Sequence, residues 1–305
     1  MTYNPRYRTQ KPDRISCLKN DTQFTEPLMQ FISARMPQAS RNDVKSWLRH
    51  GSVKVGSEVV SQFNAPVEPG VEVSVNHTRS WPRLSHPRLE LVYEDDDIIV
   101  VNKGYGLLSV GTGAAHKEET AYGILKEYVK SQNPANKIFV VHRLDRATSG
   151  LMMFAKSVEA QQAMQHNWNN MVIDRRYVAV LEGVVDDDEG VMRSNLGETS
   201  QYEVYSTADA MAGKPAVTYW KVLARGGGYT LAEFSLDTGR KNQIRVHARD
   251  MGHPIVGDRK YGAVKSPLNR VALHARSLRF AHPMTRRLMS FELPVPQRFS
   301  ALLRR

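Results

Sequence analysis

A short polar segment between two apolar runs is the feature that most limits how this chain can fold. Residues 138–141 and 151–155 are apolar, and residues 142–150 between them hold one carboxylate, Asp145, beside two arginines. Apolar runs of this length that are bounded by turn residues predict buried strands. The polar segment is therefore expected to be a loop held between two core strands, a setting in which site residues are often found.

Asp145 has two interpretations when this segment is considered alone. A single aspartate in a loop is most often structural, because it caps a turn and pairs with an arginine, and such ion pairs perturb carboxylates without catalysis. A carboxylate held rigidly in a loop can also act as a nucleophile or as a proton acceptor. The other motifs of the chain are needed to choose between the two.

The composition limits the class of protein and its partner. The chain has 305 residues, a hydrophobic share of 41% and a formal net charge of +11. A charge this positive favours a polyanionic partner, with nucleic acid ahead of a membrane surface. No apolar run reaches the roughly 18 residues of a membrane helix, and residues 1–14 are polar, without the apolar core of a secretion signal. We therefore expect a cytoplasmic, monomeric protein with no membrane partner.

The sequence gives no sign of a metal or a cofactor. Cys17 is the only cysteine, so an intrachain disulfide and a four-cysteine zinc site are both excluded. The ten histidines include no His-Glu-x-x-His pair, and no phosphate-cradling Gly-x-x-x-x-Gly-Lys-Ser/Thr loop is present. We expect the chain to work without metal, nucleotide or other cofactor.

Turn residues and composition divide the chain into four segments. We predict a flexible tail, a small unit, a proline-containing linker and a large domain, which cover residues 1–21, 22–76, 77–87 and 88–305. In the large domain, Ser157 can cap a helix that continues to about Met171 with Val158 toward the core. A second helix is predicted from about Lys241 to Met251.

The small unit carries a basic helix. Ser40 can cap this helix, and Gly51 can end it in a left-handed conformation. One face repeats a positive charge every four residues, at Arg41, Lys45 and Arg49. Such a stripe is most often a solvated helix face, and on a chain this basic it can also contact phosphates.

The small unit resembles the S4 RNA-binding domain. The resemblance rests on the Ser-Arg-x-x-Val-x-x-x-Leu-x-x-Gly pattern of residues 40–51, on Val-x-Val at 53–55 and on Pro-Gly-Val at 69–71. It implies that Arg41, Lys45 and Arg49 bind the RNA backbone. Phosphate contacts position a ligand without reading its sequence.

The polar segment of the large domain carries a more specific resemblance. Residues 142–150 match the signature His-Arg-Leu-Asp-x-x-Thr-Ser-Gly of the RluA-type pseudouridine synthases at every fixed position. The resemblance implies that Asp145 is the catalytic residue. It also implies that Arg143 fills the gap left by a flipped base, and that His142 holds the loop or touches RNA.

A second motif of that family supplies a partner for Asp145. Residues 239–247 resemble Gly-Arg-x-His-Gln-Ile-Arg-x-His, except that Asn242 stands where histidine is usual. The resemblance implies that Arg245 pairs with Asp145 and that Arg240 and Gln243 contact the substrate. The pairing is physically reasonable, because a buried charge left without its partner costs about 3–5 kcal/mol.

Two further residues are candidates for holding the base. Tyr177 falls in an Arg/Lys-x-Tyr element whose tyrosine, in the family, stacks on the target uracil, and Leu273 is a possible apolar contact below the base. Both are equally compatible with ordinary core positions. Gly104 replaces the proline of the family's Asn-Lys-Pro-x-Gly-Leu element, and this change is expected to loosen its loop.

The resemblance covers about residues 24–300 in the order of the family's motifs. It implies an α+β fold, with a catalytic domain on a mixed, largely antiparallel sheet with flanking helices and a small α/β N-terminal domain. The implied activity is isomerisation of uridine to pseudouridine in ribosomal or transfer RNA. The alternatives are a non-catalytic RNA-binding or ribosome-assembly protein and a nucleic-acid hydrolase, but a hydrolase would need a second carboxylate or a metal cluster near the motif.

Overall fold

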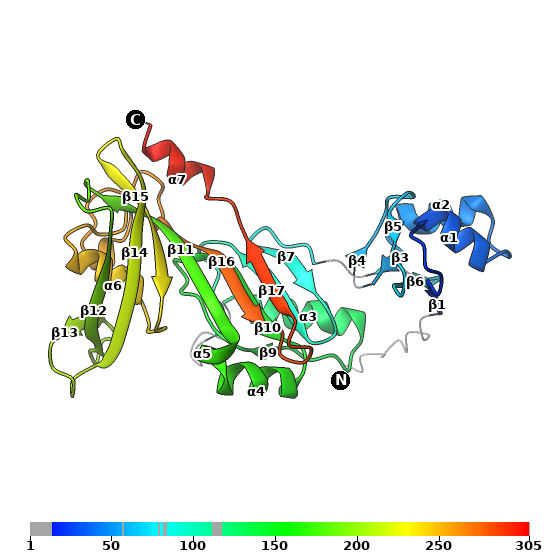
Figure 1. Cartoon of the computed structure of the whole chain (residues 1–305), viewed down its shortest axis with the longest axis horizontal. Helices are drawn as coiled ribbons and strands as arrows, with labels where there is room; N and C mark the ends of the chain where they lie inside the picture. Colours follow the sequence, from blue (N-terminus) through cyan, green and yellow to red (C-terminus); the bar gives the residue numbers. More distant parts are fainter. Residues whose placement is uncertain (1–13, 57, 79, 82–83, 112–117, 305) are drawn as a thin grey trace, which may run out of the picture. The chain divides into compact units, whose positions relative to one another are not determined.

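The chain forms two compact units. The computed structural model describes residues 14–56, 58–78, 80–81, 84–111 and 118–304. The two units are Met1–Arg83 and Leu84–Arg305 (Figure 1). No helix in these described ranges is long and apolar enough to cross a membrane.

The N-terminal unit combines two helices with two small sheets. A four-stranded antiparallel sheet has the order β1-β6-β3-β4, formed by Ile15–Lys19, Glu72–Asn76, Val53–Val55 and Glu58–Val59. The helices are α1 (Leu28–Arg35) and α2 (Arg41–Arg49), and β2 (Glu26–Pro27) pairs with β5 (Pro66–Val67). Strand β1 lies where a flexible tail was predicted, so that prediction is wrong for residues 15–19; residues 1–13 lie outside the described part.

Helix α2 begins and ends as its sequence predicts. The Ser40 side chain accepts a hydrogen bond from the Asp43 amide, and the Asp43 carboxylate accepts one from the Ser40 amide. Gly51 follows the helix with φ at +67°. Arg41, Lys45 and Arg49 are all exposed, as a stripe that contacts solvent or a ligand requires.

The predicted linker, residues 77–87, is not free chain where it is described. The Trp81 amide donates to the Gly51 carbonyl at 2.9 Å, and the Lys54 ammonium lies 4.6 Å from the centre of the Trp81 ring. Leu84, in turn, packs against the core of the second unit. Prolines and basic residues suggested a linker, but part of this segment is built into each unit.

The second unit is built on one large sheet. Its strand order is β13-β12-β14-β15-β11-β16-β10-β8-β7, with β17 added beside β16 and β9 beside β10. The strands are β7 (Leu89–Glu94), β8 (Ile98–Lys103), β9 (Phe139–Val140), β10 (Ser149–Ala155), β11 (Val172–Glu182), β12 (Glu189–Glu198), β13 (Val204–Thr207), β14 (Lys214–Gly226), β15 (Tyr229–Leu236), β16 (Leu273–Ala281) and β17 (Leu288–Glu292). Among these described strands only β10 and β16 pair in parallel. The predicted α+β fold with a largely antiparallel sheet is confirmed.

Helices cover both faces of the sheet. Helix α3 (Ala121–Gln132) packs against Ile99 and Val101, whereas α4 (Val158–His166) packs against Ile98 and Val100. Alternate residues of a strand point to opposite faces, so a strand buried on both sides must be apolar throughout. This explains why β10, the strand after the polar segment, is buried along its whole length.

Two further helices pack on the sheet, and the helix predicted after Ser157 is shorter than expected. Helix α6 (Gln243–Asp250) and α7 (Gln297–Leu302) pack on β11, β14 and β15. The helix predicted from Ser157 to Met171 is broken at Asn167 into α4 and α5 (Trp168–Met171). Val158, expected to face the core, is 42% exposed, because it lies at the first position of α4.

The parallel contact between β10 and β16 places the site. It is only two residue pairs long, Ser149 with His274 and Gly150 with Ala275. The loop that carries Asp145 enters β10 at this contact, and Leu273 begins β16 beside it. The short contact therefore brings the polar segment next to residues that are far away in the sequence.

Candidate active site

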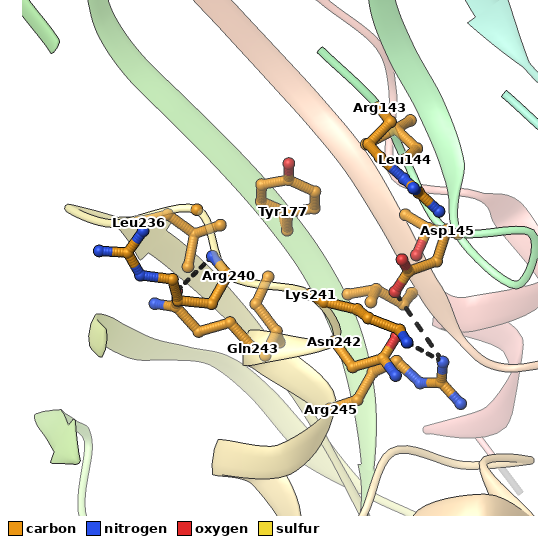
Figure 2. Close-up of a pocket in the computed structure, with 14 residues that line it drawn as sticks. Arg143, Leu144, Asp145, Tyr177, Leu236, Arg240, Lys241, Asn242, Gln243 and Arg245 are labelled. Carbon is orange, nitrogen blue, oxygen red and sulfur yellow. Dashed lines mark hydrogen bonds and ion pairs between the residues drawn. The ribbon is translucent and has the colours of Figure 1, made fainter. Parts of the chain in front are cut away.

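A cavity of about 180 Å³ opens beside the polar segment. Its wall comes from the loop before β10, from β11, from residues 236–245 and from the start of β16 (Figure 2). Seven of the residues predicted for catalysis or substrate binding line it: Arg143, Asp145, Tyr177, Arg240, Gln243, Arg245 and Leu273.

Asp145 is held at the cavity by its own loop. The Ser109 hydroxyl accepts from the Leu144 amide at 3.0 Å and donates to the Leu144 carbonyl at 2.6 Å, which anchors the preceding residue. The Asp145 carbonyl accepts from the Thr148 amide at 3.1 Å. Burial raises the pKa of the Asp145 carboxyl above its ordinary value, although nearby cations act in the opposite direction. The carboxylate is thus positioned by backbone and poorly solvated.

Arg245 lies beside Asp145 but binds another carboxylate more closely. Its Nη1 is 3.9 Å from Asp145 Oδ2. Its Nε and Nη2 donate to the two oxygens of Asp258, at 2.6 and 2.7 Å. Asp258 was missed in the sequence, although it lies in a Gly-Asp-x-x-Tyr-Gly stretch (residues 257–262) that also resembles the family. Its buried position, with 1% exposure, explains the need for a cationic partner.

Asn242, the departure from the family pattern, also holds Arg245. Its Oδ1 accepts from Arg245 Nη1 at 3.1 Å, and its Nδ2 donates to the Tyr261 hydroxyl at 2.8 Å. The residue has φ at +53°, in the left-handed region that asparagine tolerates better than most side chains. The Tyr261 ring lies beside the guanidinium, with the Arg245 Cζ 4.9 Å from the ring centre. Asn242 therefore bonds both to Arg245 and to the ring that packs against it.

Lys103 is a second charged residue that the sequence interpretation missed. Its side chain is fully buried at the end of β8, and its Nζ donates to the carbonyls of Leu107 at 2.8 Å and Gly104 at 3.1 Å. Burial lowers the pKa of Lys103 to about 8, and the negative charge of Asp145 opposes that shift. The Asn-Lys element of the sequence was the available signal.

Gly104 does not loosen its loop as predicted. Its amide donates to the Arg88 carbonyl at 2.7 Å, a bond that proline in this position would lose. A Cβ added here would lie 3.0 Å from the Arg88 Cα, Cβ and O. Where the family has proline, Gly104 allows the loop to approach the Arg88 backbone closely, and this contact holds the loop in place.

Tyr177 and Leu273 form an apolar part of the cavity wall. Figure 2 shows the Tyr177 ring between the segment carrying Leu236 and the loop carrying Asp145. Leu273 is 3% exposed and belongs to the core, so its cavity contact is the edge of a core residue. A flat ring beside a carboxylate is suited to a planar heterocycle.

Gln243 and Arg240 differ in what they can offer a ligand. The Gln243 Oε1 accepts from Thr238 Oγ1 and from the Arg240 amide, and its Nε2 donates to Val217 and Thr218. Because both ends of this amide are used by the protein, Gln243 supports the wall and does not present a free polar group. Arg240 donates only its Nε, to the Pro215 carbonyl, and is exposed.

His142 is not brought to the cavity. Its Nε2 accepts from the Met153 amide at 3.0 Å, and its ring centre lies 5.1 Å from that of Trp168. Burial lowers the pKa of His142 to about 3, so the ring remains neutral in this bond. Of the two roles expected of His142, the structure supports holding the loop, through its bond to β10.

Comparison with known proteins identifies the family of this chain. The family described as RNA pseudouridylate synthase matches residues 97–250. The uncharacterized RNA pseudouridine synthase YlyB of Bacillus subtilis is 34% identical over 95% of this chain and 97% of its own length. Ribosomal large subunit pseudouridine synthase D of Neisseria meningitidis serogroup B is 36% identical over 89% of this chain and 76% of its own.

A solved structure gives the same result. Human RNA pseudouridylate synthase domain containing 1 superposes with a TM-score of 0.55 at 26% identity, over 70% of this chain and 87% of its own. The predicted enzyme class is confirmed, ahead of a non-catalytic RNA-binding protein or a hydrolase. The chain belongs to the RNA pseudouridine synthase family, among relatives of the RluA type.

Proposed function

We propose that this protein converts a uridine of large-subunit ribosomal RNA to pseudouridine, with Asp145 as the catalytic carboxylate. The substrate class is supported by relatives named ribosomal large subunit pseudouridine synthase D, from Pasteurella multocida and Neisseria meningitidis. The observation that carries the catalytic assignment is the cavity wall: among its described residues, Asp145 is the only carboxylate.

The reaction needs no change in oxidation state. The N1–C1′ bond of uridine breaks, the uracil turns, and a C5–C1′ bond forms; C5 then loses its proton and N1 gains one. A carboxylate can take part as a nucleophile or as a base, and both roles require its ionised form. Burial raises the pKa of Asp145, and the surrounding cations favour the ionised form and oppose that effect.

The cavity residues divide the remaining tasks. The target base must leave its stack to reach Asp145, which costs a few kcal/mol. Stacking on the Tyr177 ring returns roughly 1–3 kcal/mol, with Leu273 as an apolar contact. Arg143 is exposed at the rim, where its planar guanidinium can fill the gap that the base leaves. Arg245 keeps the carboxylate charged and oriented.

The N-terminal unit provides a separate RNA contact in this proposal. The exposed stripe of Arg41, Lys45 and Arg49 on α2 binds phosphates, as the S4-like pattern implies. These contacts increase affinity without reading sequence. Choice of the uridine is left to the cavity and its rim.

Tritium release from RNA labelled at C5 of uridine tests the proposal. Ribosomal and transfer RNA from cells lacking this protein are incubated with wild type, with Asp145→Asn, and with Asp187→Asn as a control on an exposed loop. We expect release from ribosomal RNA by wild type and Asp187→Asn only. Release by Asp145→Asn would refute the catalytic assignment, and release from transfer RNA alone would refute the substrate.

A further inference from the structure

The guanidinium of Arg245 is shared unequally between two carboxylates. Asp258 takes two of its nitrogens at 2.6 and 2.7 Å, whereas Asp145 lies 3.9 Å from the third. Asn242 occupies that third nitrogen as well, at 3.1 Å. Arg245 therefore binds Asp258, behind the cavity, through two short bonds. Its contact with Asp145, the catalytic carboxylate, is the longer one.

This sharing has an electrostatic consequence. Asp258 is 1% exposed, so its charge is not screened by water and offsets the charge of Arg245. The pair has no net charge and reaches Asp145 mainly as an oriented dipole. Asp145 is thus held by Arg245 without being fully neutralised by it, and a carboxylate that keeps its charge density remains a better nucleophile or base.

We propose that Asp258 is a positioning residue for the reaction, which fixes the Arg245 guanidinium and limits how far Arg245 neutralises Asp145. The proposal rests on the proposed function of Asp145. Asp258 does not line the cavity, so it acts through Arg245 rather than on the substrate. A residue that only stabilised the fold would have no effect on the titration of Asp145.

The other charged groups around Asp145 have to be kept constant in a test. Its own loop, β8, and the segment leading into α6 all contribute cations: Arg143, Lys103, Lys241 and Arg245. Tyr177 faces it from β11 and is uncharged at neutral pH, and burial raises the pKa of its hydroxyl further from neutrality. Substitutions at positions 258 and 242 leave all of these side chains in place and act on one of them, Arg245.

The test compares two substitutions of opposite charge at the same guanidinium. Asp258→Asn removes a negative charge and keeps the size of the side chain and one acceptor oxygen. Asn242→Asp adds a negative charge at Nη1. Glu127→Gln, on the exposed face of α3, controls for loss of a distant carboxylate. Each full-length variant is assayed for single-turnover tritium release across the acid range, together with RNA affinity and melting temperature.

The two substitutions should shift the acid limb of the rate profile in opposite directions. In Asp258→Asn, Arg245 stabilises the charge of Asp145 more strongly, so the acid limb of the rate profile moves to lower pH by about half a unit to one unit. The maximal rate falls by about ten- to a hundredfold, since the guanidinium is held less firmly. In Asn242→Asp the acid limb moves to higher pH. The RNA affinity of Asp258→Asn stays unchanged, because Asp258 is buried and does not line the cavity.

Other outcomes overturn the inference. An acid limb that stays in place or moves to higher pH in Asp258→Asn would mean that Asp258 only holds the fold. If Asp258→Asn does not fold, Asn242→Asp decides alone, and an unmoved limb there refutes charge sharing. Absence of release by the wild type would instead refute the proposed function, a result distinguishable from either of these.

Discussion

At the level of single residues, the site depends on one buried arginine with two acidic neighbours. Arg245 is 9% exposed and bridges Asp258 behind the cavity to Asp145 in its wall. The sequence predicted the second contact through a motif, but not the first. Neither contact lies within one helix or strand, and spacing in a sequence reveals partners only within such an element.

Removing this arginine should destabilise the protein as well as inactivate it. Arg245→Ala leaves Asp258 buried without a cation, which costs about 3–5 kcal/mol of the free energy of unfolding. Urea denaturation measures the cost, with Arg249→Ala as control, since Arg249 lies on the same helix but is partly exposed. Equal stability of the two variants would show that the buried ion pair is not needed for folding.

Several other residues show where local patterns stop being informative. Asp145, Tyr177 and Leu273 reach the cavity, as their motifs implied, because each lies on a strand or next to one. Gln243 supports the wall where a substrate contact was expected, because its amide is satisfied by backbone and hydroxyl groups of β14. His142 holds the loop through Met153, which is one of the two roles expected of it. A motif identifies the position of such a residue, whereas tertiary partners decide its role.

At the level of elements, the short parallel contact between β10 and β16 organises the site. Gly150 makes it possible, with φ at +115° and a virtual Cβ that would lie 2.1 Å from the Ala275 carbonyl oxygen. The same residue pairs with Lys103 of β8. One glycine therefore allows three strands to meet next to the loop that carries Asp145.

Replacing this glycine should separate the strands. Gly150→Ala combines an unfavourable φ with a collision against backbone, and we expect it to lower the free energy of unfolding by more than about 2 kcal/mol. Gly228→Ala is the matched control, because Gly228 has φ at +73° with nothing within 4 Å of its virtual Cβ. A thermal denaturation in which both variants lose the same stability would contradict a role for the close contact.

The buried strands of the large sheet were the most predictable elements, and an exposed edge strand of the N-terminal sheet was the least. Strands β8 and β10 are buried on both faces, so their apolar residues are continuous and easily recognised. Strand β1 is an edge strand with alternating exposed and half-exposed residues, held by backbone hydrogen bonds to β6. Its sequence has little apolar signal, so it resembled a tail. The break at Asn167 likewise leaves no strong local mark.

At the level of the whole molecule, both units expose positive charge. The positive stripe on α2 is exposed, and the cavity rim of the second unit carries exposed Arg143, Arg240 and Lys241. In the proposed function, each unit therefore offers cations to RNA phosphates. The net charge of +11 makes its binding dependent on salt.

The contribution of the N-terminal unit should appear in that salt dependence. Replacing Arg41, Lys45 and Arg49 with alanine in the full chain should reduce the slope of log affinity against log salt by about 2, since each phosphate contact contributes roughly 0.7–0.9. Single-turnover rates at saturating RNA should be unchanged. A filter-binding slope equal to that of the wild type would show that the stripe is only a solvated helix face.

The way the cavity is assembled also sets the order in which the protein regains its properties after denaturation. Asp145 precedes β10, Tyr177 lies on β11, Arg245 on α6 and Leu273 on β16, so no fragment of the sheet contains the cavity. Pairing of strands this distant in sequence is slow, because large loops must close first. On refolding, the circular dichroism of sheet and helix is therefore expected to return before catalytic activity does. Recovered turnover then reports a completed fold more strictly than a spectroscopic signal of secondary structure.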